Sequence, residues 1–296
     1  MNASPLSRFM LLSWAGVLWA LGVALFVTNS HAADSNPDAD RILALGGSVT
    51  EIVYALGEED RLIARDTTST FPAPANDLED VGYLRALSPE GVLSVDPTLI
   101  ISEEGAGPPE TIDVLRDAAI PFVTVPETYS REGILEKIRT VGDALDVPEK
   151  ADDLAARIDL ALREAEEKAA TVSETPKRVL FILSTQGGRI MAAGTNTAAQ
   201  AIIEMSGGVN AVAAFEGYKQ MTDEAVSAAA PDVILMMDRG GDHGASNDEL
   251  FTMPAIITTP AAEDEAVIRM DGLYILGFGP RTADAAIELN ERLYGG

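Results

Sequence analysis

The segments "SPEGVLSVDPTLIIS" (Ser88 to Ser102) and "TDEAVSAAAPDVILM" (Thr222 to Met236) follow one plan at two places in the chain. Each opens with a hydroxyl residue, carries a glutamate two positions later, and passes through a short helical stretch and a proline into an apolar strand. The two segments begin 134 positions apart. This repetition predicts two halves with the same arrangement of helix and strand.

Strands and helices alternate around the first copy. The stretch "RILALGGSVTEIVYALG" (Arg41 to Gly57) predicts a buried strand, a glycine turn and a helix capped by Ser48 or Thr50, with Glu51 in its first turn. We expect further strands at "RLIARD", "TLIIS" and "PFVTV", and a helix at "PPETIDVLRDAAI". Such alternation predicts a mainly parallel sheet with helices on both faces.

The pattern restarts at "KRVLFILS" (Lys177 to Ser184) and passes a Gly187-Gly188 hairpin before it repeats to the end of the chain. Between the halves, "PEKADDLAARIDLALREAEEKAATV" (Pro148 to Val172) contains no glycine. Its apolar residues have the spacing of one helix face, at Leu154, Ile158, Ala161 and Leu162. We expect one helix of about 35 Å that spans both halves; a surface helix of one half is the alternative.

These patterns predict four parts of the chain: an export segment at residues 1–32, an N-terminal α/β lobe at 33–147, a connecting helix at 148–173 and a C-terminal α/β lobe at 174–296. The export segment has Arg8, an apolar run over 9–27 and the small residues Ser30 and Ala32, as in a cleavable signal peptide. An uncleaved membrane anchor is the alternative. The chain has no cysteine, so we expect neither a disulfide, nor a thiolate metal site, nor a lipid-anchor cysteine. A soluble periplasmic protein fits these features best.

The chain is strongly acidic, with 47 Asp and Glu against 21 Lys and Arg and a formal net charge of −26. Cleavage after Ala32 removes Arg8 and no acid, which leaves −27. Such a charge argues against nucleic acid or an anionic membrane as a partner. It also draws attention to any arginine in a loop.

One such arginine lies in "DVGYLRALSPEGVL" (Asp80 to Leu93), where Tyr83 and Arg85 stand in an irregular segment before a helix start at Ser88. Neither side chain suits a core there, and Gly82 leaves room for a flat ring to approach the backbone. A half-buried tyrosine at the rim of a strand is the simpler interpretation. A phenol beside a guanidinium is also a suitable anionic ligand for ferric iron.

The chain resembles the helical-backbone class of periplasmic substrate-binding proteins of ABC importers, and within it the haem-binding branch (HmuT, ShuT and PhuT type). The resemblance is carried by "LGGSVTEIVYALG", "VGYLRALSPEGVL", "SEEGAGPPE", "MAAGTNTAAQAIIEMSGGVNAV" and "LGFGPRT". It implies two Rossmann-like lobes joined by one long helix, with the ligand in a cleft between them. It also implies a monomer that binds ferric b-type haem and passes it to an ABC permease dimer, downstream of an outer-membrane haem receptor.

The resemblance assigns roles to particular residues. Tyr83 corresponds to the axial ligand of the haem iron, and Arg239 in "MMDRGGDHG" to an arginine that assists from the second lobe. Haem also carries two carboxylates, for which Arg85 and Arg281 are further candidates. Family members dock on permease arginines through one acid per lobe, which maps onto Glu90 and Glu224; alternatively both are first-turn acids that complement a helix dipole.

Other functions remain to be weighed. A transition-metal site needs several imidazoles or thiolates, and after loss of His31 only His243 is left. A periplasmic hydrolase needs a nucleophile with a base, yet the chain has no Gly-x-Ser-x-Gly motif, so we expect no enzyme. A cobalamin or siderophore binder shares the fold and stays open.

Two glycine-proline segments, "GAGPPE" and "GFGPRT", either line the cleft or form simple turns. Met236 and Met237 are expected in the core.

Overall fold

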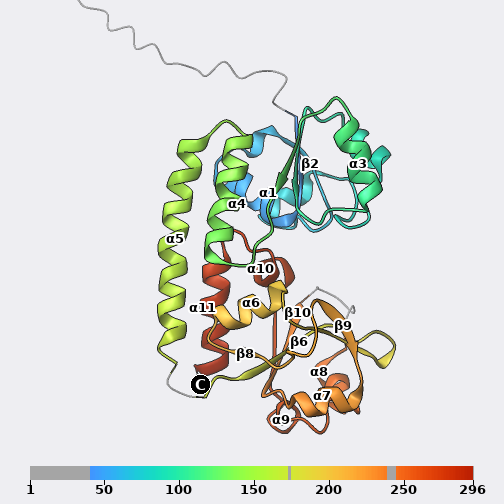
Figure 1. Ribbon diagram of the computed structural model, residues 1–296, viewed down its shortest axis with the longest axis vertical. Coiled ribbons are helices and arrows are strands. Elements are labelled where there is room, and N and C mark those ends of the chain that lie inside the picture. Colours follow the sequence, from blue (N-terminus) through green and yellow to red (C-terminus); the bar gives the residue numbers. More distant parts are fainter. Residues whose placement is uncertain (1–40, 173–174, 239–244, 296) are drawn as a thin grey trace, which may run out of the picture. The chain divides into compact units, whose positions relative to one another are not determined.

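The computed structural model describes residues 41–172, 175–238 and 245–295, all within one compact unit. Figure 1 shows an α/β fold in which two sheets, each with its own helices, are joined by the long helix α5 (Pro148–Ala170). This is the predicted two-lobe class. The expected signal peptide and the positions of Arg239 and His243 lie outside the described residues.

The first lobe contains a sheet whose strands are all parallel, in the order β3-β2-β1-β4-β5. Its strands are β1 (Ile42–Leu45), β2 (Leu62–Arg65), β3 (Glu79–Asp80), β4 (Leu99–Glu103) and β5 (Phe122–Val125). Its helices are α1 (Gly47–Ala55), α2 (Pro89–Leu93), α3 (Pro109–Asp117) and α4 (Arg131–Ala144), with short 3-10 turns η1 (Glu59–Arg61) and η2 (Ala73–Asp77).

The second lobe has a mixed sheet in the order β11-β10-β6-β7-β9, with β8 also paired to β6. Its strands are β6 (Arg178–Ser184), β7 (Ile190–Ala193), β8 (Val209–Asn210), β9 (Tyr218–Met221), β10 (Val233–Asp238) and β11 (Val267–Asp271). Its helices are α6 (Ala198–Met205), α7 (Asp223–Ala229), α8 (Asn247–Thr252), α9 (Pro260–Glu263), α10 (Gly272–Leu276) and α11 (Thr282–Tyr294). β7 runs antiparallel to β6 and β9, and the 3-10 turn η3 (Gln186–Gly188) closes the predicted Gly-Gly hairpin.

Helix α5 packs on α4 of the first lobe and on α11 at the end of the chain, and Figure 1 shows α4 along one half of α5 and α11 along the other. The predicted helix face is inward: Leu154 and Leu162 are buried, and Ile158 and Ala161 pack against the same core. At its C-terminal end, Lys168 forms an ion pair with Glu291 of α11. The helix is therefore anchored to both lobes.

The duplicated plan appears at matching places in both lobes. Ser88 caps α2 by accepting a hydrogen bond from the Gly91 amide, and Thr222 caps α7 by accepting one from the Ala225 amide. Each short helix leads into a buried strand, β4 or β10. Met236 of β10 is buried in the core, as predicted, and Met237 is partly buried.

The predicted cap of α1 is wrong. The helix begins at Gly47, with Gly46 as N-cap and no side-chain cap, which is two residues before the start that a Ser48 cap would give. Ser48 and Thr50 are inside the helix and bond elsewhere, and Glu51 lies beyond the first turn, where it is buried. The backbone of Gly46 (φ 118°) starts the helix without a hydroxyl because a left-handed glycine turns the chain sharply after β1.

The described residues include no helix with the length and apolar character needed to cross a membrane.

Candidate ligand-binding site

Tyr83 and Arg85 lie on an irregular segment whose other side chains anchor it. Val81, Leu84 and Leu87 are buried in the core of the first lobe, whereas Tyr83 is 48% exposed and Arg85 is exposed. The Ala86 amide closes a turn on the Tyr83 carbonyl at 2.7 Å. Burial of the aliphatic residues therefore fixes the segment and presents the phenol and the guanidinium to solvent.

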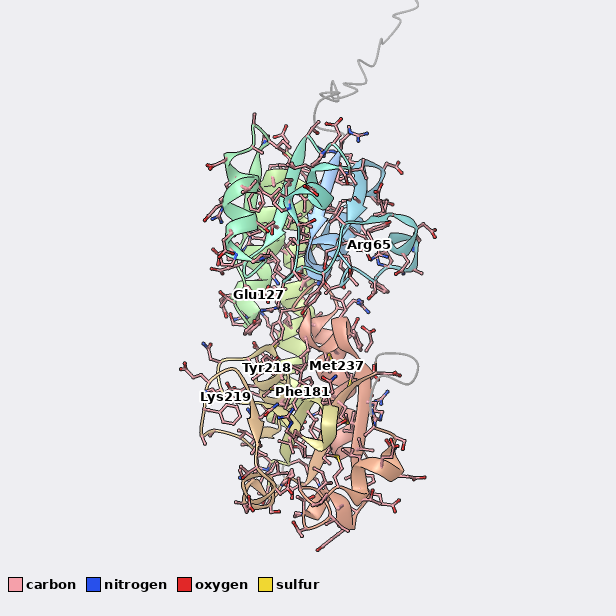
Figure 2. All side chains as sticks on the ribbon, turned by 90° about the vertical axis from the view of Figure 1, so that its right-hand side faces the viewer. Arg65, Glu127, Phe181, Tyr218, Lys219 and Met237 are labelled. Atoms are coloured by element: carbon pink, nitrogen blue, oxygen red, sulfur yellow. The ribbon has the colours of Figure 1, made fainter. Side chains whose placement is uncertain are left out.

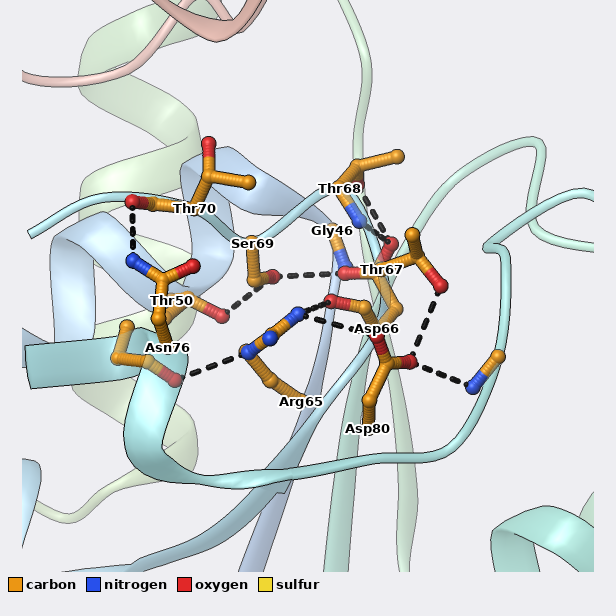
Figure 3. Close-up of polar contacts among 12 residues, drawn as sticks. Gly46, Thr50, Arg65, Asp66, Thr67, Thr68, Ser69, Thr70, Asn76 and Asp80 are labelled. Carbon is orange, nitrogen blue, oxygen red and sulfur yellow. Dashed lines mark hydrogen bonds and ion pairs between the residues drawn. The ribbon is translucent and has the colours of Figure 1, made fainter. Parts of the chain in front are cut away.

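A polar network holds the start of this segment (Figure 3). Asp80 accepts hydrogen bonds from the Gly82 amide at 2.8 Å and from the Thr67 hydroxyl at 3.0 Å. Its second oxygen pairs with the buried Arg65 guanidinium at 3.3 Å. Gly82 has φ 109°, which favours glycine, and a Cβ there would meet no atom within 4 Å. The space above the backbone next to Tyr83 is open, as the sequence predicts.

The "GAGPPE" segment forms hydrogen bonds with the residues that follow Tyr83. The Gly107 amide donates to the Leu84 carbonyl at 2.9 Å, and the Leu87 amide donates to the Gly107 carbonyl at 2.8 Å. The Thr111 hydroxyl adds a bond to the Leu87 carbonyl. This glycine-proline stretch therefore supports the Tyr83 segment directly.

Two further tyrosines lie within electrostatic reach of Arg85. Burial raises the pKa of Tyr129, with Glu127 adding to the shift and Arg85 opposing it. Burial also raises the pKa of Tyr218 to about 12, with Tyr129 adding and Arg85 again opposing. Tyr129 follows β5 of the first lobe and Tyr218 opens β9 of the second. The charge of Arg85 therefore acts on one phenol of each lobe.

Aromatic residues of the second lobe back both phenols. Tyr129 packs edge-on against Phe278, with ring centroids 5.2 Å apart. Figure 2 shows Tyr218 beside Phe181, and their ring centroids are 6.4 Å apart. These contacts supply apolar surface next to an arginine, a combination that suits a flat apolar ligand with acidic groups.

The sequence patterns above do not single out Tyr129 or Tyr218, although a signal for one of them exists. Tyr218 follows Gly217 and precedes the cap Thr222, just as Tyr83 follows Gly82 and precedes the cap Ser88. Both glycines have positive φ, 73° and 109°. Tyr218 is thus the counterpart of Tyr83 in the duplicated plan. Tyr129 has no such sequence signal.

The "GFGPRT" segment of the second lobe packs on the first turn of α1. A Cβ on Gly279 would touch Ser48 at 3.4 Å, and the Lys137 ammonium of α4 donates to the Gly277 carbonyl at 3.3 Å. Arg281 donates to the Glu51 carboxylate through its backbone amide at 3.1 Å and its guanidinium at 3.0 Å. This segment forms the contact between the lobes.

Lys137 is fully buried and holds two carboxylates. Its ammonium lies 2.6 Å from Glu127 and 3.0 Å from both Glu103 and the Ser48 hydroxyl. Burial and the neighbouring Glu103 raise the pKa of Glu127 to about 9. The pKa of Glu103 is lowered: burial opposes this, but Lys137 and hydrogen bonds outweigh it. Around neutral pH the two acids share one proton beside one ammonium, so the cluster is close to neutral.

The Arg281 side chain makes several contacts, although its buried Nε has no hydrogen-bond partner among the described residues. Its guanidinium lies 3.5 Å from the Phe71 ring centroid and 5.1 Å from that of Tyr274, besides its ion pair with Glu51. Burial raises the pKa of Glu51, and Arg281 opposes that shift. The arginine is thus held between the lobes by a carboxylate and two rings, rather than projecting freely like Arg85.

A family model described as periplasmic binding protein matches residues 42–273. The chain belongs to this family. Binding proteins of this kind serve ABC importers, so the protein is a transport component and not an enzyme. The family points to the periplasm or the cell exterior as its location.

Among solved structures, the periplasmic haem-binding protein BhuT in complex with two haems is 38% identical, covers 86% of this chain and 97% of its own, and has a TM-score of 0.81. The apo periplasmic haem-binding protein RhuT from Roseiflexus sp. RS-1 is 37% identical over 86% and 98% of the two chains, with a TM-score of 0.82. The vitamin B12-binding protein of Vibrio campbellii (strain ATCC BAA-1116) is 28% identical over 77% of this chain and 80% of its own.

As a member of this family, the protein carries two acids at equivalent positions of its lobes. Glu90 and Glu224 are exposed in the first turns of α2 and α7. Bonds to its own backbone amide and to Thr222 lower the pKa of Glu224. Both carboxylates are therefore accessible and lie at the same point of the duplicated plan.

Within residues 41–172, 175–238 and 245–295, no three His, Asp or Glu side chains form a group that could hold a metal ion.

Proposed function

We propose that this binding protein carries ferric haem in the periplasm, bound between its lobes, and delivers it as a monomer to an ABC haem permease of the inner membrane. An outer-membrane haem receptor supplies the ligand upstream. One observation carries the proposal: Tyr83 and Arg85 project together from a segment that Asp80 and Gly107 hold rigid. The greater identity to the haem-binding proteins BhuT and RhuT than to the vitamin B12-binding protein supports haem as the ligand.

Tyr83 is the proposed axial ligand of the haem iron. A phenolate is a hard anionic ligand that suits Fe(III), and the nearby Arg85 guanidinium stabilises the phenolate form. Tyr129 and Tyr218, backed by Phe278 and Phe181, would line the macrocycle.

The two propionates require positive charge. Arg85 is the first candidate because it is exposed and beside the tyrosines. Arg239 is the second, by resemblance alone, since it lies outside the described residues. Arg281 is the third candidate, because its guanidinium already forms an ion pair with Glu51.

Haemin titration followed by absorbance spectroscopy tests the proposal. The parent protein should bind haemin with a phenolate-to-iron charge-transfer band, and Tyr83→Phe should lose that band and much of the affinity while keeping weak apolar binding. Tyr129→Phe and Tyr218→Phe are matched controls that should keep the band. An unchanged spectrum in Tyr83→Phe contradicts the assignment and makes His243 the next ligand to test.

Vitamin B12 is the second candidate, favoured by the V. campbellii relative. Cobalamin carries amides where haem carries free carboxylates, so it offers Arg85 no carboxylate partner. Titration with cyanocobalamin decides between them, because tight binding of cyanocobalamin without haemin binding would replace the haem proposal.

A further inference from the structure

A polar pocket of about 430 Å³ lies at the β6–β7 turn of the second lobe. Its lining residues are Ser184, Gln186, Gly187, Arg189, Met191 and Gln220. Hydroxyl and amide groups and one guanidinium face this space, above a methionine. None of the lining residues is acidic, in a chain with 47 acidic residues.

Arg189 is the cation of this pocket and has no acidic partner. In the described part of the chain, no carboxylate forms an ion pair with it, whereas Arg131 and Arg281 each pair with acids. Its side chain does not hold the turn together, because the turn is closed by backbone bonds such as that from the Arg189 amide to the Gln186 carbonyl. An exposed arginine without a structural contact is available to a ligand.

The pocket lies on the same face of the sheet as Tyr218. In the β7–β9 register Met191 pairs with Gln220 and Ala193 pairs with Tyr218. Residues two apart on a strand face the same side, about 7 Å from one another. Gln220 and Met191 therefore continue the surface that Tyr218 begins, toward Arg189.

We propose that this pocket is a carboxylate-binding subsite for the macrocycle held between the lobes, with the Arg189 guanidinium as its cation and the Gln186 and Gln220 amides as further donors. The inference rests on the proposed function, since it names where one acidic group of the bound haem goes. A guanidinium and a carboxylate form charge-assisted, often bidentate, hydrogen bonds. Arg85 in the first lobe and Arg189 in the second would then contact the ligand from opposite sides.

A comparison of haemin with its dimethyl ester tests whether Arg189 binds a carboxylate of the ligand. The ester retains the ring and the iron but lacks both carboxylates. Arg189→Gln should weaken haemin binding about 10-fold or more, the effect of one charged hydrogen bond, and leave ester binding unchanged. Arg189→Lys should recover part of the haemin affinity. Arg157→Gln, at an exposed arginine of α5, removes the same charge elsewhere and should change neither ligand.

The outcomes distinguish failure of the Arg189 subsite from failure of the proposed haem-binding function. If the parent binds haemin with the tyrosinate spectrum but Arg189→Gln binds it equally well, or loses haemin and ester affinity alike, the subsite is wrong and the proposed function stands. If the parent does not bind haemin at all, both are wrong. Unfolding midpoints of the variants should match the parent, because Arg189 makes no side-chain contact that stabilises the fold.

Discussion

The ammonium of Lys137 in the first lobe donates a hydrogen bond to the carbonyl of Gly277 in the second, 140 positions along the chain. The same ammonium binds Glu103 at the end of β4 and Glu127 after β5, so one buried charge ties both places to the segment that contacts the first lobe from the second. Arg281 and Glu51 form another link between the same two segments. The contact between the lobes therefore includes buried polar groups, whose loss is costly, besides an apolar core that residues of both lobes share.

Lys137→Met should destabilise the protein by about 3–5 kcal/mol, because it leaves Glu103 and Glu127 buried without their cation. Chemical unfolding monitored by circular dichroism measures this. Arg139→Met is the matched control: it lies on the same helix, but its ion pair with Asp152 is exposed, so it should cost about 1 kcal/mol or less. Equal effects of the two substitutions would show that Lys137 does not hold the cluster.

Stability should fall as pH rises from about 4.5 to about 9. Glu127 keeps its proton in the folded protein up to a pKa of about 9, whereas the unfolded carboxyl releases it near 4.5. The folded state therefore binds the extra proton in this window, and the free energy of unfolding declines by at most about 1.4 kcal/mol per pH unit. Two other shifts change the stability outside this pH window. The lowered pKa of Glu103 makes stability depend on pH below about 4.5, and the raised pKa of Lys137 does so above about 10.5.

Urea unfolding at several pH values checks this slope. Glu127→Gln keeps the neutral form and should flatten the decline, whereas Glu110→Gln, on the exposed surface of α3, should leave it as in the parent. A Glu127→Gln protein with the parent's slope would assign the titration to another group.

Arg281→Ala should destabilise the protein more at pH 8 than at pH 5. Without the guanidinium, buried Glu51 must either remain charged and unpaired or take up a proton, which is easier at the lower pH. We expect a loss of about 3 kcal/mol at pH 8 from chemical unfolding. Arg292→Ala, whose pair with Glu288 is exposed, should cost about 1 kcal/mol or less at both pH values. A loss that does not depend on pH would exclude Glu51 as its cause.

The sequence predicts those parts of the site that depend on local patterns. The exposure of Tyr83 and Arg85 follows from their alternation with Val81, Leu84 and Leu87, and the two lobes follow from the repeated segments. Periodicity likewise predicts the buried face of α5. In each case the residues that interact are close in sequence or belong to a repeat.

The rest of the site depends on distant partners. In the sequence, Lys137 looks like an ordinary lysine of a helix surface, because its partners are far away along the chain. Ser48 lies 89 positions from it and Gly277 lies 140 positions from it. The "GFGPRT" segment resembles an ordinary turn until its contact with α1 is known. The incorrect cap of α1 has the same origin: Ser48 is a good capping residue by type, but Glu103 and Lys137 occupy its hydroxyl.

Arg239→Ala should weaken haemin binding about 10-fold or more if Arg239 bonds the Tyr83 oxygen or a propionate. The visible spectrum separates these possibilities: loss of a bond to the phenolate shifts the charge-transfer band, whereas loss of a propionate contact leaves it in place. Arg178→Ala, at the first residue of β6, removes one positive charge elsewhere and should leave haemin affinity unchanged. Unchanged affinity and spectrum in Arg239→Ala would leave Arg85 and Arg281 as the arginines to test.

Charge reversal at both Glu90 and Glu224 should abolish haem uptake and leave haemin affinity intact. The two carboxylates occupy equivalent, exposed first-turn positions on α2 and α7, where each can meet an arginine of one half of a permease dimer. Uptake into proteoliposomes that contain the permease, with Glu90→Lys/Glu224→Lys as the binding protein, measures the effect. A Glu110→Lys/Asp248→Lys protein is the control, because these acids also lie in exposed first turns but belong to α3 and α8, outside the duplicated pair. If the Glu90/Glu224 variant supports uptake at the parent rate, these acids only complement the dipoles of their own helices. Loss of uptake in both variants would show that uptake depends on the overall negative charge rather than on two defined contacts.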